Sequence, residues 1–156
     1  MSNMDDFIFC LYRDRWVLTS AEQVDRGATL LAPPVRIVEH DDRVKLRSVI
    51  EELLREEPPV VPQPDYNSPR FVKDLRLEPL GLKTWREFVK DGRCFNVEKK
   101  GPKLLLEEWA REGGNFSARA SWQQEFRGGD TEALVDYVVE LTKPGLLRRK
   151  PKKAGS

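Results

Sequence analysis

The sequence predicts a mixed α+β fold, in which an antiparallel β-meander packs with helices in a single domain. Two patterns lead to this fold class. Segments with alternating apolar and polar residues recur between glycine-containing turns in 95–122, as in neighbouring antiparallel strands. Apolar residues recur at spacings of three and four in 43–56 and 134–141, which is typical of helices with one buried side. A chain of 156 residues is long enough to bury one sizeable core.

The N-terminal part of the chain predicts three strands followed by a helix. Segments 7–13 and 16–19 are rich in β-forming residues, with a bend between them, and 35–37 is a third short strand. The stretch 21–32 favours neither helix nor strand. Asp42 is well placed to cap the helix that follows, because its carboxylate can accept a hydrogen bond from a free amide of the first turn.

Prolines end this helix and begin a stiff crossover at 58–69, which contains five of the eleven prolines. Proline-rich segments are extended rather than flexible. Neither side of the crossover has enough apolar residues for a comfortable core of its own. We therefore expect one domain over 1–143, followed by a basic tail at 144–156.

The second half predicts a short helix, the meander and a last helix. Thr84 and Glu87 fit a capping box, in which each side chain accepts a hydrogen bond from the other residue's amide, and Gly92 ends that helix. In the final strand of the meander, one face is expected to carry Phe116, Ala118, Ala120 and Trp122. Asp130 or Thr131 caps the last helix. The expected order is β-β-β-α, crossover, α-β-β-β-α.

The net charge of +1 hides an uneven distribution. The tail carries five basic residues and no acid, which leaves 22 basic and 26 acidic side chains in 1–143, a charge of −4. The N-terminus lacks the basic region of a signal peptide, and no stretch approaches the roughly 18 apolar residues of a membrane span. We expect a cytoplasmic protein in which Cys10 and Cys94 are separate, buried, reduced thiols.

Catalytic and metal chemistry has little support in the sequence. His40 is the only histidine, so a zinc site lacks ligands, and none of the usual nucleotide-binding, serine-hydrolase or metalloprotease motifs occurs. Adjacent acids such as Glu107 and Glu108 point to opposite faces of a strand, which makes them poor acid–base partners. We expect no enzyme activity, cofactor, metal or small-molecule substrate; an enzyme centred on His40 stays open as an alternative.

Nucleic-acid binding is a second alternative. Aromatic residues occur with arginine and lysine nearby, as a stacking surface requires. Their spacing is typical of a core, and the acidic charge of 1–143 disfavours contact with phosphates. The tail at 144–156 is the part of the chain that fits an adaptor for nucleic acid.

The stretch 79–143 resembles the contact-dependent growth inhibition immunity proteins of bacterial toxin–immunity systems. The matching residues are Gly81, Lys83, Thr84, Trp85, Phe88, Lys90, Val97, Gly113, Gly114, Phe116 and the apolar helix 134–141. The match covers the C-terminal 65 residues or so and the N-terminal half only in outline. It departs in Thr84, where the family has serine, which keeps the helix cap, and in the basic tail.

This resemblance implies a cytoplasmic, non-catalytic protein that binds the toxic C-terminal domain of a cognate secreted effector and blocks its active site. An acidic body suits a nuclease toxin, whose nucleic-acid cleft must be basic. The candidate partner-binding residues are Asp5, Asp6, Glu39, Asp41 and Asp42. We expect neither a membrane nor nucleic acid as the partner. Another kind of non-catalytic protein-binding module remains an alternative.

Overall fold

A computed structural model describes residues 6–25, 27 and 29–143. Its strands are β1 (Asp6–Tyr12), β2 (Arg15–Val24), β3 (Thr29–Glu39), β4 (Val60–Val61), β5 (Gly92–Lys100), β6 (Lys103–Glu112) and β7 (Asn115–Arg127). Its α-helices are α1 (Arg43–Arg55), α2 (Trp85–Asp91) and α3 (Thr131–Leu141), and two short 3₁₀ helices cover Pro69–Phe71 and Glu78–Leu80. The fold is mixed α+β, as predicted.

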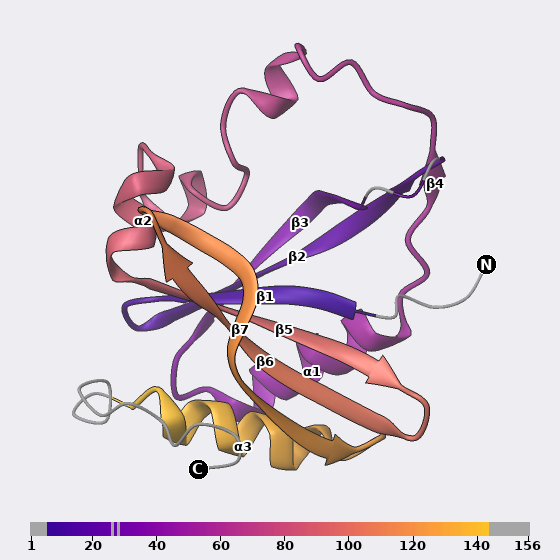
Figure 1. The fold of residues 1–156 in the computed structure, drawn as a ribbon, viewed down its shortest axis with the longest axis vertical. Helices are drawn as coiled ribbons and strands as arrows, with labels where there is room; N and C mark the ends of the chain where they lie inside the picture. The colour runs from indigo at the N-terminus through magenta and orange to yellow at the C-terminus, as the bar shows by residue number, and fades with distance from the viewer. Residues whose placement is uncertain (1–5, 26, 28, 144–156) are drawn as a thin grey trace.

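The strands form one sheet in the order β3-β2-β1-β5-β6-β7 (Figure 1). These neighbours are antiparallel, and β5, β6 and β7 are the predicted meander. The pairing of β1 with β5, in which Phe9 faces Phe95, joins the two halves of the chain in one sheet. The crossover also contributes β4, which lies parallel to the end of β2 and was not predicted.

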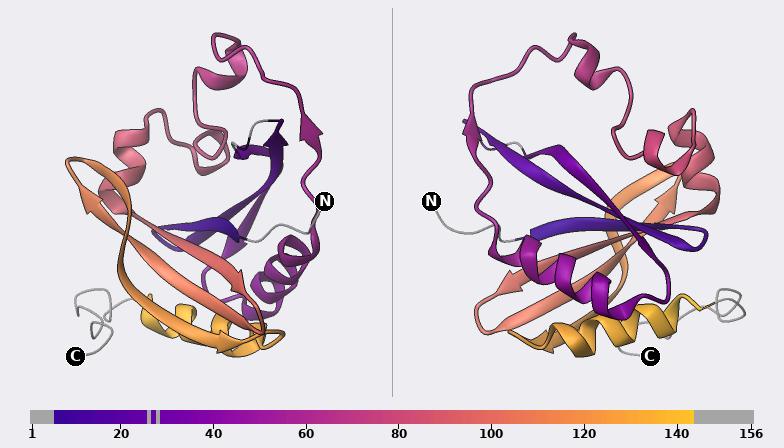
Figure 2. Two further views of the ribbon diagram at one scale, coloured as in Figure 1. Left: turned by 45° about the vertical axis from the view of Figure 1, so that its right-hand side comes forward. Right: turned by 180° about the vertical axis from the view of Figure 1, so that it is seen from behind.

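The two long helices begin at the residues that the sequence predicts. The Asp42 carboxylate accepts from the Lys45 amide at 3.1 Å and caps α1, and Asp130 accepts from the Ala133 amide at 3.2 Å and caps α3. Both helices lie against the same side of the sheet, which we call the helix face (Figure 2). Each buries one apolar stripe, as its sequence period requires.

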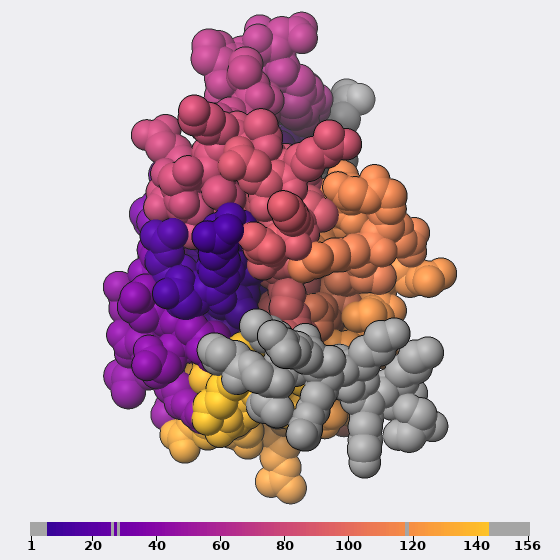
Figure 3. All heavy atoms as spheres, turned by 90° about the vertical axis from the view of Figure 1, so that its left-hand side faces the viewer, coloured from indigo at the N-terminus to yellow at the C-terminus, as the bar shows by residue number. Residues whose placement is uncertain are grey.

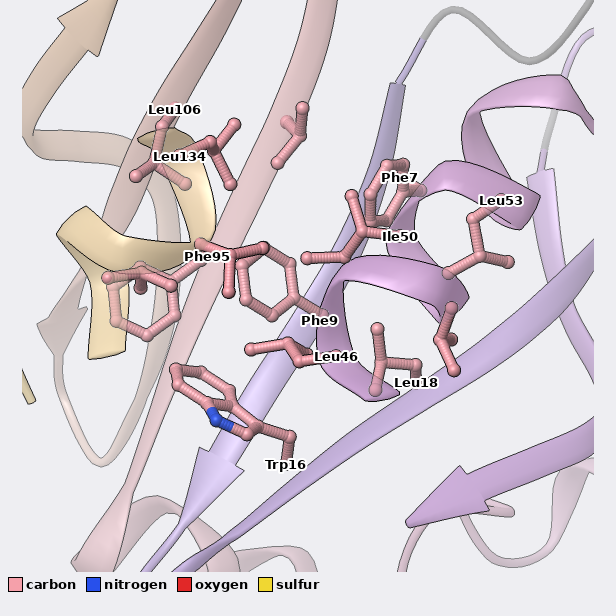
Figure 4. Close-up of a cluster of buried hydrophobic side chains, with 14 of the residues drawn as sticks. Phe7, Phe9, Trp16, Leu18, Leu46, Ile50, Leu53, Phe95, Leu106 and Leu134 are labelled. Carbon is pink, nitrogen blue, oxygen red and sulfur yellow. The ribbon is translucent and has the colours of Figure 1, made fainter. Parts of the chain in front are cut away.

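The main core lies between these helices and the sheet (Figure 4). At its centre the Phe9 ring lies 5.3 Å from Trp16 and 5.5 Å from Phe95, and all three side chains are fully buried. Leu46 and Ile50 of α1 and Leu134 of α3 pack around them. Burial of each such side chain contributes about 1.5–3 kcal/mol of stability.

The opposite side of the sheet, the front face, has a second apolar cluster. Segment 74–91, which we call the covering segment, contributes Leu77, Leu80 and Phe88 to it, packed against the strands. The Phe88 ring stacks on Tyr12 of β1 and on Trp85, with centroids 5.7 Å and 4.9 Å apart. Figure 3 shows this segment between the β1–β2 turn and the β6–β7 hairpin. The predicted capping box of Thr84 and Glu87 is present at the start of α2.

Two expectations from the sequence are wrong in detail. Cys10 and Cys94 are not separate thiols: they face each other across β1 and β5, with Cα atoms 4.2 Å apart, and form a disulfide. Phe116 and Trp122 do not share a face of β7, because Phe116 packs in the front cluster and Trp122 in the main core. The β6–β7 register shifts twice between these two residues, and such bulges reverse the side-chain alternation.

Candidate interaction surfaces

The structure places the predicted acidic residues at two separate sites. Asp6 opens β1, opposite Glu98 of β5. Glu39, Asp41 and Asp42 lie at the turn between β3 and α1, beyond the other end of β1. Seven residues of strand put about 20 Å between the two sites. The predicted acids therefore do not converge, and Asp5 and the basic tail at 144–156 lie outside the described residues.

The turn site borders an open hollow of about 610 Å³. Glu39 and Asp41 are exposed and line it, together with Asp14, Arg43 and Lys143. Three acids and two bases thus face this space. Asp42 is committed to the cap of α1 and does not line the hollow.

His40 lies in the same turn, where its ring and its carbonyl both contact other parts of the fold. Its Nε2 is 2.8 Å from Thr142 Oγ1, and its carbonyl accepts a hydrogen bond from the Trp16 indole at 3.3 Å. Burial lowers the pKa of His40 below its usual value. The contact with Thr142 links the turn to the end of α3. A histidine that acts as a general base is oriented by a carboxylate, whereas the neighbour of His40 is a threonine hydroxyl.

Two further kinds of site were searched for in the described part of the chain. No three His, Cys, Asp or Glu side chains gather there as they would around a metal ion. None of the described helices has the length and apolar character to cross a membrane.

The crossover borders a second open hollow, of about 780 Å³. Leu30 and Leu31 of β3 form one wall, and Phe71 and Leu75 form the other. Arg70 bridges the walls, because its guanidinium donates to Glu22 at 2.7 Å and to the Leu31 carbonyl at 3.2 Å. These contacts tie the crossover to the edge of the sheet.

A third surface is the part of the front face that the covering segment leaves uncovered. Because successive side chains of a strand point to opposite faces, the strand register assigns its members. They are Asp6 and Ile8 of β1; Asn96, Glu98 and Lys100 of β5; Lys103, Leu105, Glu107 and Trp109 of β6; and Gln123, Glu125 and Arg127 of β7. Of these, Ile8 also packs against the front cluster. We call this surface the open half. No described helix lies over it, since α1 and α3 are behind the sheet (Figures 1 and 2).

Side-chain contacts order the middle of the open half. The Glu107 carboxylate accepts from Gln123 at 2.7 Å and from Asn96 at 3.4 Å, which joins three neighbouring strands. Lys103 lies 3.2 Å from Glu125, and both side chains are more than half exposed. The carboxylates therefore occupy the middle rows, and the lysines lie toward the β5–β6 turn.

Trp109 lies where the open half meets the apolar cluster of the covering segment. Its place in β6 is between Glu107 and Arg111, whose guanidinium donates to backbone carbonyls at the end of α2. The side chain is half-buried and belongs to neither apolar cluster. Among the side-chain hydrogen bonds and ring contacts of the described residues, none involves Trp109, whereas the spacing of the aromatic residues in the sequence is typical of a core.

Sequence reasoning missed most of the open half. Of its acids, only Asp6 is a candidate from the sequence, where Glu107 is considered only as an acid–base partner of Glu108. The alternation in 95–98 does place Asn96 and Glu98 together on one side of a strand. The alternation alone gives neither the register of β5 against β6 and β7 nor the residue at which the covering segment ends.

The comparisons with known proteins give a fold and no family. No family model matches the chain, and no curated protein matches it. Among solved structures, a protein of unknown function from Neisseria meningitidis is similar with a TM-score of 0.59 at 13% identity, over 90% of this chain and 95% of that one.

A second similar structure is a chain of the CdiA-CT/CdiI toxin and immunity complex from Yersinia pseudotuberculosis. Its TM-score is 0.53 at 13% identity, over 85% of this chain and 95% of that one. At this identity the likeness establishes a shared fold along most of both chains.

Proposed function

We propose that this protein is an immunity protein, which binds the toxic C-terminal domain of a cognate contact-dependent growth inhibition effector and blocks its active site. The observation that carries the proposal is the fold shared with a chain of a toxin and immunity complex, over 85% of this chain. The resemblance of 79–143 to the immunity family rests on sequence and supports it independently. The protein acts by binding, and the toxin supplies the chemistry.

The charge of the chain suits a nuclease as the target. A nuclease holds phosphates in a basic cleft, and 1–143 carries a charge of −4. Opposite potentials raise association rates above the 10⁵–10⁶ M⁻¹s⁻¹ or so of an unsteered pair. Fast capture is valuable here, because the toxin must be blocked before it meets its substrate.

We place this encounter in the cytoplasm, where a nuclease toxin finds its substrate. The Cys10–Cys94 disulfide is unusual for that compartment, because cytosolic reductants keep most thiols reduced. Alkylation of the protein in freshly lysed cells, followed by mass spectrometry, measures the oxidation state directly. A fully oxidised pair would count against the cytoplasm, and a reduced pair would agree with it.

Co-expression tests the proposed function. The proposal predicts that a large secreted protein is encoded beside this gene, and the C-terminal domain of that protein is produced with and without the full chain. We expect growth arrest without the chain and growth with it, together with a nanomolar dissociation constant for the purified pair by calorimetry. No protection combined with no binding, or a neighbouring gene that encodes no secreted protein, would contradict the proposal.

A further inference from the structure

We infer that the open half of the front face is the docking surface for the toxin domain, and that the toxin presents basic groups to its carboxylates. This inference rests on the proposed function. It adds the location of the interface and the chemistry of the partner surface.

The first argument is the position of Trp109. Interface centres are enriched in aromatic residues, and tryptophan is among the residues that contribute most binding energy. Trp109 is half-buried beside polar neighbours, and it lies next to the rigid front cluster of the covering segment. A partner that covered it would bury the rest of its indole ring and could accept a hydrogen bond from the indole nitrogen. Leu105 lies on the same surface and is 94% buried between its neighbours, so an apolar side chain lies beneath the polar ones.

The second argument is charge complementarity. Two neighbouring rows of the open half contain four acids, Asp6, Glu98, Glu107 and Glu125, together with Ile8, Asn96, Leu105 and Gln123. The three bases of this surface, Lys100, Lys103 and Arg127, all lie in the next row, toward the β5–β6 turn. A basic partner surface therefore fits over the middle rows, and an acidic edge of the same partner fits over the bases.

The third argument is rigidity. Glu107 is held by Asn96 and Gln123, and the backbones beneath these side chains are paired strands. Preorganised groups lose little conformational entropy on binding, which leaves more of their interaction energy as affinity.

The other surfaces fit a basic partner less well. At the turn site, bases lie among the acids, because Glu39 and Asp41 share their hollow with Arg43 and Lys143, and Glu39 lies beside Arg15 in the sheet. In the open half, Lys100 also lies 4.0 Å from Glu98 and Lys103 lies 3.2 Å from Glu125, but both lysines are in one row at the edge of the surface. At the crossover, the hollow is bridged by Arg70. Neither site offers neighbouring rows of carboxylates beside a half-buried tryptophan.

Two matched double variants of the full chain test the inference. Glu107→Lys with Glu125→Lys reverses two acids of the open half, and Glu39→Lys with Asp41→Lys reverses two acids of the turn site. Both raise the net charge by the same amount, so any general loss of attraction is equal. The purified toxin domain encoded beside the gene is the probe, its dissociation constant is measured at 150 mM salt, and thermal unfolding verifies the fold of each variant.

We expect the open-half variant to weaken binding at least about 30-fold, since like charges then meet at the interface, and the turn variant to weaken it less than about 3-fold. Trp109→Ala should also weaken binding about 30-fold. Should the open-half variant unfold, Glu107→Gln replaces it, with a smaller loss and a weaker salt dependence.

The outcomes separate the two claims. Equal losses in the two double variants, or a larger loss in the turn variant, overturn the inference and leave the proposed function standing. Tight binding by Trp109→Ala and by both double variants also overturns it. A wild-type chain that does not bind the toxin domain overturns the proposed function, and the inference with it.

Discussion

The two halves of the front face are made by the same strands and yet differ in chemistry. Under the covering segment, β1 and β5 carry Cys10, Tyr12 and Cys94, which are buried together with Phe88. One row further along β5 stands Asn96, which is buried and donates to Glu107, and beyond it the partly exposed carboxylate of Glu98. The alternation of β5 does not change between the two halves; what changes is whether another part of the chain covers them.

The two halves of the front face therefore have different roles. The covered half stabilises the fold, because apolar area removed from water contributes about 25 cal/mol per Å². The open half is ordered by polar side-chain contacts between neighbouring strands, and Trp109 lies between the two halves. Four substitutions test whether the two halves differ in this way.

The largest expected effect is in the covered half. Phe88→Ala removes a fully buried ring that contacts Tyr12, Trp85 and Phe116, and it should lower the free energy of unfolding by about 3–5 kcal/mol. Gln123→Ala in the open half should cost less than about 1 kcal/mol, since its side chain is exposed. Urea unfolding measures both. Similar losses would mean that the open half is part of the stabilising core.

The second effect concerns close packing under α2. A Cβ atom at Gly92 would lie 2.6 Å from the Phe88 carbonyl oxygen and 2.8 Å from its ring. Gly92→Ala should therefore cost about 1–3 kcal/mol by overpacking. Lys90→Ala, an exposed position on the same helix, is the control and should change stability by less than about 0.5 kcal/mol. A tolerated Gly92→Ala would show that α2 is loosely seated.

The third effect depends on pH. Burial opposes the charged form of Asp74, but two hydrogen bonds and the charge of Arg76 outweigh it and hold the pKa of Asp74 below its usual range. The pKa of Asp74 is lower in the folded state than its unfolded value of about 3.9, so ionised Asp74 stabilises the fold above that pH. This stabilisation is lost as the pH falls through the pKa of the folded state.

Asp74→Asn should accordingly cost about 1 kcal/mol at pH 7 and should reduce the loss of stability between pH 5 and pH 3. Thermal unfolding across this range measures both. Asp65→Asn, at an exposed acid of the crossover, is the control for the general effect of removing one charge. An unchanged acid profile for Asp74→Asn would contradict the assigned role of Arg76.

The smallest effect is in the open half. Lys103 and Glu125 are 58% and 60% exposed, so Lys103→Ala should cost about 0.2–1 kcal/mol. High salt should abolish even this difference. At about 1 M salt the Debye length is about 3 Å, so the two charges are screened from each other. A larger, salt-resistant loss on unfolding in urea would show that the open half is buried in solution.

Local signals predicted most of the fold. Asp42 and the Thr84 capping box mark helix starts through hydrogen bonds within a few residues, Gly92 follows the last residue of α2, and the meander alternates over short segments. The stretch 21–32 has no such signal, and its strands form because β2 and β3 pair with each other. Register shifts in β7 and the meeting of the two cysteines depend on strand pairing, which no local pattern encodes.

The candidate surface was less predictable than the fold. An acid on a strand looks the same in the sequence whether its face is covered or open, so Glu98 and Glu107 gave no signal. Trp109 resembles a core residue, because an aromatic side chain in a strand is usually buried. Only the extent of the covering segment separates the two halves, and that is a property of tertiary structure.

Amide hydrogen exchange of the full chain, with and without the toxin domain encoded beside its gene, tests the central claim most directly. If the open half docks the toxin, exchange slows in β6 near Trp109 and in β7, and it is unchanged in the covering segment 74–91 and at the turn 39–42. Protection confined to the turn or to the covering segment, with β6 and β7 unchanged, would contradict the account.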